Sequence, residues 1–184
     1  LRYIVENAPK TKEWKGLKEF CEKFLESHLE KRVHELLKTV KLEKVQVTIR
    51  HSQSISDLVK EAKLDYANSD ISDRNFKEDK QKDEKAEATL IHIGQVATAE
   101  EAEAVIKHLK LCSGKVKGLV SLSIDHPNKQ REFPIVEVGS DWRYPNGYRY
   151  VAYLNGWNDR RELNLDWRGY GWGDDCRFLA FSEV

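Results

Sequence analysis

The last 52 residues constrain the fold most, because they combine short alternating patterns with a high concentration of aromatic side chains. Residues 133–184 contain twelve of the eighteen aromatic residues of the chain and four of its five tryptophans, and all six of their cations are arginines. Alternation of apolar and polar residues predicts strands over Tyr148–Leu154 and Arg161–Trp167, and Arg177–Phe181 is expected to form the last strand. A turn is expected at Asn155-Gly156. The sequence therefore predicts a C-terminal β-meander.

The N-terminal part carries the opposite pattern, that of a long amphipathic helix. Apolar residues recur at spacings of three and four from Trp14 to Val40, and Thr11 is expected to be the N-cap. A helix of about 29 residues is long for a globular protein. It would either break near His28 or pack its far end on a partner.

Capping sequences predict two further helices. Ser54 and Asp57 form a Ser-x-x-Asp start for a short helix that runs to about Leu64, and a capping box at Thr98–Glu101 opens a helix that runs to about Leu111. Strands are expected at Lys44–Arg50, Thr89–Gly94, Lys115–Ile124 and Phe133–Val138. The last two would form a hairpin around the turn at Asp125–Asn128.

Together these elements predict one α+β domain over residues 1–184, a length sufficient for one core. Residues 1–64 would be its helical N-terminal part, 65–88 a charged mobile loop, and 89–184 the sheet-forming part with the aromatic C-terminus. The long N-terminal helix and the second capped helix are expected to pack on a mainly antiparallel sheet.

Composition excludes several classes of partner and compartment. The chain has 31 lysines and arginines against 31 aspartates and glutamates, so no overall field directs it to nucleic acid or to an anionic membrane. Cys21, Cys112 and Cys176 are far apart and form no C-x-x-C motif, which favours a reducing, cytoplasmic location over a zinc site. No apolar run reaches the roughly 18 residues of a membrane span. A start at Leu1 with no methionine in the sequence is consistent with a piece of a longer protein.

The aromatic residues and arginines in predicted turns are the main candidate for function. Tyrosine, tryptophan and arginine are the side chains most enriched at recognition hot spots. We therefore predict a non-enzymatic recognition module without a cofactor, whose binding surface consists of Trp142, Arg143, Tyr144, Trp157, Tyr170 and Trp172. A protein partner or self-association is expected first. Single-stranded nucleic acid comes second, because the last 52 residues hold six arginines against eight acids.

Two further alternatives stay open from the sequence. Glu162, Asn164 and Asp166 near Trp157 and Trp172 would suit a carbohydrate, which ranks third. A metal-dependent hydrolase or nuclease is the enzymatic alternative, with Asp125, His126, Glu137 and Asp141 as the metal or acid–base residues. Position 139 is glycine, whereas a restriction-type nuclease would have a lysine there.

Overall fold

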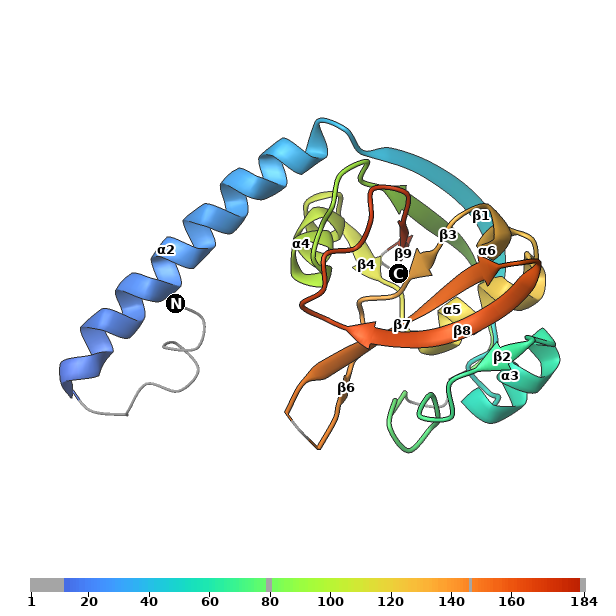
Figure 1. The fold of residues 1–184 in the computed structure, drawn as a ribbon. Coiled ribbons are helices and arrows are strands. Elements are labelled where there is room, and N and C mark those ends of the chain that lie inside the picture. Colours follow the sequence, from blue (N-terminus) through green and yellow to red (C-terminus); the bar gives the residue numbers. More distant parts are fainter. Residues whose placement is uncertain (1–11, 79–80, 146, 183–184) are drawn as a thin grey trace.

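The computed structural model describes residues 12–78, 81–145 and 147–182. Its helices are α2 (Lys12–Leu37), α3 (Ile55–Ala62), α4 (Ala99–His108), α5 (Val116–Asp125) and α6 (Lys129–Glu132). Its strands are β1 (Lys41–Ile49), β2 (Tyr66–Ala67), β3 (Glu84–His92), β4 (Leu111–Ser113), β5 (Ile135–Val136), β6 (Trp142–Arg143), β7 (Arg149–Trp157), β8 (Arg160–Trp167) and β9 (Arg177–Ser182). These strands form one sheet in the order β1-β3-β9-β5-β7-β8-β2, with β4 added to β9 and β6 added to β7 (Figure 1).

The α+β prediction is confirmed, including the mainly antiparallel sheet. Only the β2–β8 and β5–β9 pairs are parallel among the described strands. Strands β6, β7 and β8 are successive antiparallel neighbours and form the expected C-terminal meander. The last strand leaves the meander, because β9 crosses to the centre of the sheet and pairs with β3 and β5.

Helices cover both faces of the sheet, and each face has its own hydrophobic cluster. On β9, Leu179 points into the cluster that includes α3 and α5, whereas Phe178 and Ala180 point into the cluster that includes α4 and the end of α2. This alternation follows from the two-residue period of a strand. The long helix and the capped helix therefore share one face, and α3 and α5 cover the other.

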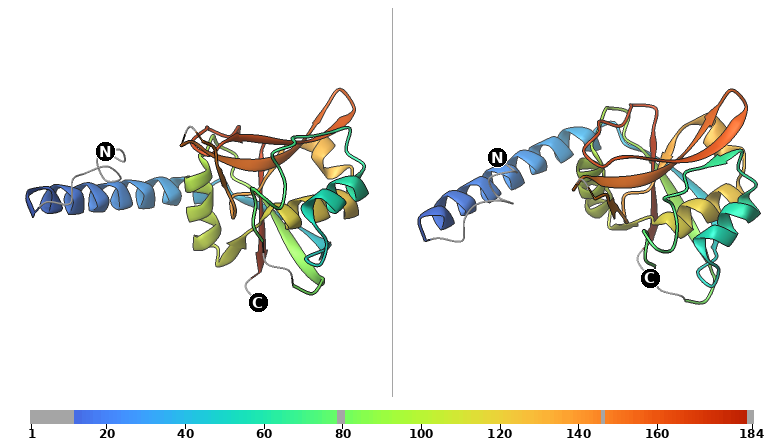
Figure 2. Two further views of the ribbon diagram at one scale, coloured as in Figure 1. Left: turned by 90° about the horizontal axis from the view of Figure 1, so that it is seen from below. Right: turned by 60° about the horizontal axis from the view of Figure 1, so that its bottom comes forward.

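The long helix α2 is continuous through His28, so the predicted break does not occur. Val33 and Leu36, near its C-terminal end, are buried in the cluster with α4. The rest of α2 projects away from the sheet in every view (Figures 1 and 2). Its exposed apolar side chains are Trp14, Leu17, Phe20 and Phe24. The predicted cap Thr11 lies outside the described residues. No helix within the described ranges is long and apolar enough to cross a membrane.

Both predicted capping sequences form. The Ser54 hydroxyl accepts a hydrogen bond from the Asp57 N–H at 3.0 Å. Thr98 and Glu101 form a reciprocal capping box, with the Thr98 N–H donating to the Glu101 carboxylate at 2.8 Å and the Glu101 N–H donating to the Thr98 hydroxyl at 3.2 Å. These caps satisfy amide groups that have no partner inside the helix, and so fix where α3 and α4 begin.

The predicted strand at Lys115–Ile124 is wrong, because this segment forms helix α5. Every residue from Val116 to Ser123 is buried, including the polar Lys117, Ser121 and Ser123, so the helix has no solvent-facing polar side that would mark its period in the sequence. The predicted hairpin with Phe133–Val138 is therefore absent, and that second segment contributes only the two residues of β5.

The segment 65–88, predicted as a charged mobile loop, contains strand β2, two buried apolar residues and the start of β3. Ile71 and Phe76 are buried in the cluster with α3 and α5. The Asp73 carboxylate accepts a hydrogen bond from the Ile55 N–H at 3.1 Å, at the start of α3. Strand β3 already begins at Glu84. Two buried apolar residues are enough to anchor a segment whose average composition is polar.

The hairpin between β7 and β8 turns at Asn158-Asp159, three residues after the Asn155-Gly156 turn predicted from sequence. Trp157 pairs with Arg160, so the loop has two residues, and both have positive φ, at 46° and 63°. Positive φ at both positions is typical of a type I′ turn, whose twist matches that of the strands it joins.

Because glycine adopts positive φ without steric cost, Asp159→Gly should stabilise the protein by about 0.5–1 kcal/mol. Urea unfolding of the variant and the wild type measures this difference. The opposite change, Asn158→Val, serves as the control and should destabilise, since a β-branched residue is strained at positive φ. A loss of stability in Asp159→Gly would mean that the Asp159 side chain has a stabilising role beyond the turn geometry.

Candidate recognition surface

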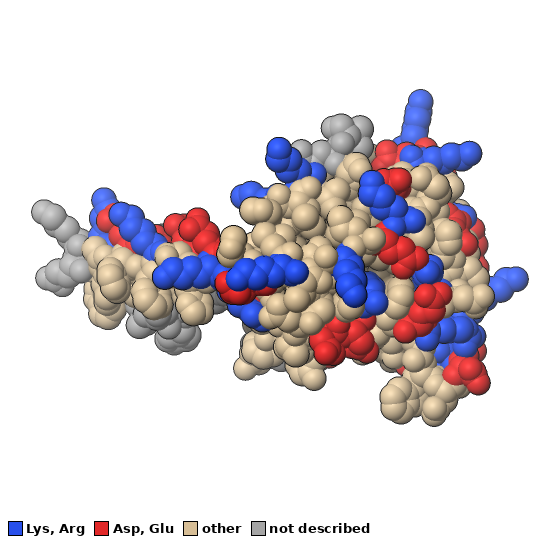
Figure 3. Space-filling model, turned by 90° about the horizontal axis from the view of Figure 1, so that it is seen from above, with Lys and Arg blue, Asp and Glu red and all other residues tan. Residues whose placement is uncertain are grey.

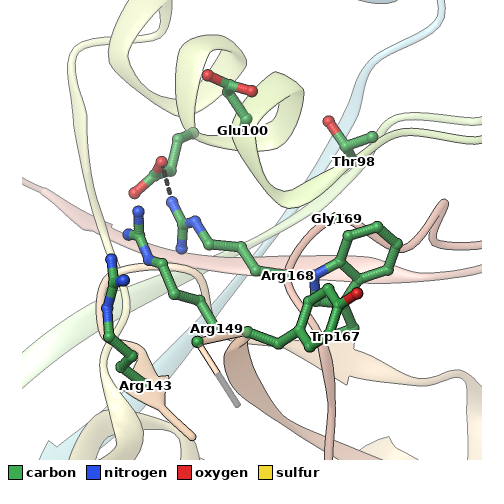
Figure 4. A pocket seen from close by; sticks show the side chains of 10 residues that line it. Thr98, Glu100, Arg143, Arg149, Trp167, Arg168 and Gly169 are labelled. Carbon is green, nitrogen blue, oxygen red and sulfur yellow. Dashed lines mark hydrogen bonds and ion pairs between the residues drawn. The ribbon is translucent and has the colours of Figure 1, made fainter. Parts of the chain in front are cut away.

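A pocket of about 630 Å³ lies between the β6–β7 hairpin, the end of β8 with the residues after it, and the start of α4. Its charged lining consists of Arg143, Arg149, Arg168, Glu100 and Glu103, and its aromatic lining of Tyr148 and Trp167. We call it the arginine–aromatic pocket. Figure 4 shows the three guanidinium groups on one side of the pocket and the indole of Trp167 on the other.

An ion-pair network holds two of the three arginines. The Arg149 Nε–H donates to Asp141 Oδ2 at 2.7 Å, and Arg168 Nη1 lies 3.9 Å from the same oxygen. Arg168 also forms an ion pair with Glu103 of α4 and donates from Nη1 to the Val138 carbonyl at 3.1 Å. The network connects α4, the segment before β6, the hairpin and the end of β8, and it fixes the position of Arg168.

Arg143 differs from its two neighbours. It lies directly opposite Arg149 in the β6–β7 pair, so the two cations face each other across the strands. The Arg143 side chain is exposed, and within the described residues its guanidinium forms no hydrogen bond or ion pair. Like charges directly opposite each other destabilise a sheet, and of these two opposed arginines only Arg149 forms an ion pair with Asp141.

The aromatic side of the pocket is an edge-to-face pair. The rings of Tyr148 and Trp167 have centroids 5.8 Å apart and planes at 84°, and the two residues are 54% and 44% exposed. Gly169 allows the indole to lie where it does, since a Cβ built on Gly169 would be 2.5 Å from Cζ2 of Trp167. The pair therefore offers solvent a preformed apolar surface beside the arginines.

A second aromatic group lies on the same hairpin. Trp142 packs edge-to-face on Tyr144, with centroids 5.1 Å apart, and both rings contact Tyr150. Trp142 is half-buried and also contacts the cluster of α3 and α5, whereas Tyr144 is 42% exposed. This group gives the hairpin a rigid aromatic base.

The six predicted binding residues do not form one surface. Trp142, Arg143 and Tyr144 lie together on the β6 side of the hairpin, and Arg143 reaches the pocket. Trp157 is 67% exposed at the turn end of β7, and no ring contact involves it within the described residues. Tyr170 is exposed and contacts Trp172 edge-to-face, with centroids 6.2 Å apart.

The prediction that Trp172 is a surface residue is wrong. It is 3% exposed and belongs to the cluster of α4 and the end of α2. An isolated antiparallel bridge to Ala97 holds it there, with the Trp172 N–H donating to the Ala97 carbonyl at 2.9 Å and the Ala97 N–H donating back at 3.1 Å. A Cβ on Gly171 would lie 2.9 Å from Cγ1 of Val96, so this glycine lets the segment lie close to the residue before Ala97.

The four residues of the alternative metal site are engaged in separate interactions. Asp125 accepts from Arg50 Nη2 and from the Thr48 N–H, both at 2.7 Å, and His126 Nε2 lies 2.7 Å from the Gln46 carbonyl oxygen. Asp141 belongs to the arginine network. Among the described residues no group of three or more His, Cys, Asp or Glu side chains is arranged to hold a metal ion.

Glu137 is fully buried and supports the segment that leads to the pocket. Its carboxyl group accepts hydrogen bonds from the Ser140 N–H at 3.0 Å, the Ser140 hydroxyl at 2.9 Å and the Ala152 N–H at 3.3 Å. Burial raises the pKa of Glu137 to about 8. Its neutral form therefore ties the turn before β6 to β7.

The sequence pattern did not indicate Tyr148, Arg149, Trp167 and Arg168 as site residues, although they are four of the ten residues that line the pocket. Alternation places Tyr148, Arg149 and Trp167 in strands, and Arg168 directly follows the second of them. These strand ends meet the start of α4 only in the folded chain. Searches against protein-family models, curated proteins and solved structures gave no match. The chemistry of the pocket is therefore the basis for a functional proposal.

Proposed function

We propose that this protein is a non-enzymatic recognition module that binds another protein through the arginine–aromatic pocket and the adjoining hairpin. The observation that carries the proposal is the exposed, preformed Tyr148–Trp167 pair beside three arginines in a hollow of about 630 Å³. Large rigid rings bury much area at a small cost in side-chain entropy, and arginine adds directional hydrogen bonds. Tyr144, exposed on the same hairpin, would extend the contact area.

Charge supports a protein partner over single-stranded nucleic acid. Binders of single strands combine stacking rings with a positive groove. Here the arginines of the pocket are accompanied by an equal number of acids, Glu100, Glu103 and Asp141. Figure 3 shows lysine, arginine, aspartate and glutamate side chains interspersed on the face that it presents, and the net charge of the chain is zero. Such a surface has no field that would attract a polyanion over a distance.

The proposal includes a cytoplasmic location. Cys21 and Cys176 are buried free thiols, and Cys112 is an exposed free thiol. An exposed thiol persists in a reducing compartment, whereas an oxidising one favours its conversion to a disulfide. The test treats freshly isolated protein with a thiol reagent after denaturation. Modification of all three cysteines would support this location. Resistance to the reagent would argue against it.

The test selects ligands from a phage-displayed library of random dodecapeptides and measures the affinity of the selected peptides by fluorescence anisotropy. We expect peptides that bind the wild type and lose at least about tenfold in affinity to the double variant Tyr148→Ala/Trp167→Ala, because its anchor rings are gone. Trp157→Ala is the matched control. It removes an even more exposed indole, at the turn end of β7, and should bind like the wild type.

A second variant separates ring position from ring loss. Gly169→Ala keeps both rings but places a methyl group where the Trp167 indole now lies. This variant should bind the same peptides with lower affinity. Its melting temperature is measured as a check on folding. Selected peptides that bind the double variant as tightly as the wild type would refute the pocket as the binding surface. Tighter binding of fluorescein-labelled oligothymidine than of any selected peptide would favour nucleic acid instead.

A further inference from the structure

Within the residues that the structure describes, the pocket combines a cation that has no ion-pair partner with an apolar wall, and this combination suits one chemical group. We propose that the arginine–aromatic pocket binds an acidic side chain of the partner, with Arg143 as the principal donor and with an apolar or aromatic neighbour of that acid packed on Tyr148 and Trp167. This inference rests on the proposed function and specifies the chemistry of the partner.

The first argument is the opposed arginine pair. Arg143 and Arg149 face each other across β6 and β7, which is unfavourable in an isolated sheet. Asp141 offsets the charge of Arg149, and within the described part of the chain the Arg143 guanidinium has no such partner. A carboxylate bound at Arg143 would supply the missing counter-charge and accept two parallel N–H bonds from the planar guanidinium. Among the described residues the opposed pair thus carries one positive charge without an ion-pair partner, which a bound anion would offset.

The second argument concerns how much negative charge the site can accept. Arg168 is committed to Glu103, Asp141 and the Val138 carbonyl, and its side chain is only 14% exposed. Arg149 uses Nε and Nη2 on Asp141. Three acids already lie around the three arginines, so a chain of phosphates would meet repulsion from these acids. One carboxylate, which needs the donors of one arginine, fits the arrangement best.

The third argument is the position of the aromatic pair. In Figure 4, Trp167 lies across the pocket from the guanidinium groups of Arg143, Arg149 and Arg168. A ligand that fills the pocket would therefore present its charge to one side and an apolar group to the other. An acidic side chain next to a phenylalanine, leucine or similar residue has this character, whereas a free inorganic anion would leave the rings uncovered.

The experiment compares two acetylated and amidated peptides, one of alternating glutamate and phenylalanine and one of alternating glutamine and phenylalanine. They have the same shape and differ in charge. By isothermal titration calorimetry we expect the glutamate peptide to bind at least about tenfold more tightly, since a hydrogen bond to a charged group is stronger than a neutral one. Arg143→Gln should abolish this preference, and the melting temperature should stay the same or rise slightly, because the exposed side chain is one of two opposed cations.

Arg160→Gln is the matched control. Arg160 is 55% exposed at the turn end of the neighbouring hairpin and lies outside the pocket, so the preference for glutamate should remain. Equal binding of both peptides, lost in Tyr148→Ala/Trp167→Ala, would overturn the carboxylate inference and leave the recognition module intact. Binding of phage-selected peptides together with no binding of either designed peptide would have the same meaning. A competition experiment uses a fluorescein-labelled form of the glutamate peptide. If oligothymidine displaced it more effectively than the unlabelled glutamate peptide does, the ligand of the pocket would be a phosphate and not a carboxylate.

Discussion

Replacing Trp172 by alanine should lower the free energy of unfolding by about 3–5 kcal/mol, the range seen when large buried aromatic side chains are truncated. The indole is 3% exposed and packs edge-to-face on Tyr153 at 5.2 Å, in the cluster that joins α4 and the end of α2 to the sheet. Its removal leaves a cavity that the surrounding backbone cannot fill, because the Ala97 bridge holds the loop in place. Urea unfolding followed by circular dichroism measures the loss.

Two companion variants test whether packing is the cause. Trp172→Phe should change the stability by less than about 1 kcal/mol, because it keeps most of the packing and removes an indole N–H that is buried without a partner among the described residues. Trp157→Ala removes an indole that is 67% exposed and should change the stability by less than about 0.5 kcal/mol. A Trp172→Ala protein as stable as the wild type would place that indole outside the core.

Trp172 also shows where sequence patterns stop being informative. An indole between Gly171 and Gly173 is typical of a surface loop, because nothing nearby in the sequence gives it a packing partner. Its partner is Ala97, which is brought to it by the fold. The same limit explains the pocket, since Arg168 meets Glu103 of α4 and Asp141 of another segment. Patterns within one element predict the element, and contacts between elements decide which of its side chains reach solvent.

The helices illustrate the same distinction. Local signals were sufficient for α3 and α4, whose caps are formed by residues three positions apart. They failed for α5, because a helix buried on every side has no polar face to reveal its period, and alternating valine, leucine and isoleucine resemble a strand. Close packing explains part of the burial of α5. A Cβ on Gly118 would lie 2.9 Å from the ring of Phe181, so this turn of α5 packs directly on β9.

The second large effect is a dependence of stability on pH that comes from Glu137. Burial opposes ionisation of this acid, and the hydrogen bonds from Ser140 and Ala152 favour it. Burial has the larger effect and raises the pKa from 4.5 to about 8. An acid whose pKa is higher in the folded state holds its proton more tightly there. The proton on Glu137 therefore contributes fully to the stability of the folded state below pH 4.5, and this contribution to the free energy of unfolding is lost as the pH rises through about 8.

The measurement compares the wild type with Glu137→Gln, whose amide does not ionise. From about pH 5 to about pH 9 the wild type should lose roughly 3–4 kcal/mol more than the variant, because each pKa unit corresponds to about 1.4 kcal/mol. The comparison removes the contribution of groups common to both proteins. The groups whose contributions cancel include Tyr153, whose pKa is raised chiefly by burial, and Cys176, whose pKa burial raises to about 12.

The variant should be the less stable protein at the acidic end, because its NH2 group replaces one acceptor oxygen and faces the donors of either Ser140 or Ala152. At about pH 9 the difference in the free energy of unfolding between the two proteins should become smaller or change sign, since only the wild type then carries a buried charge. Parallel pH profiles would instead show that Glu137 is ionised in the folded protein throughout this range. The three hydrogen bonds to its carboxylate would then outweigh burial, and the turn before β6 would be held by a charged group.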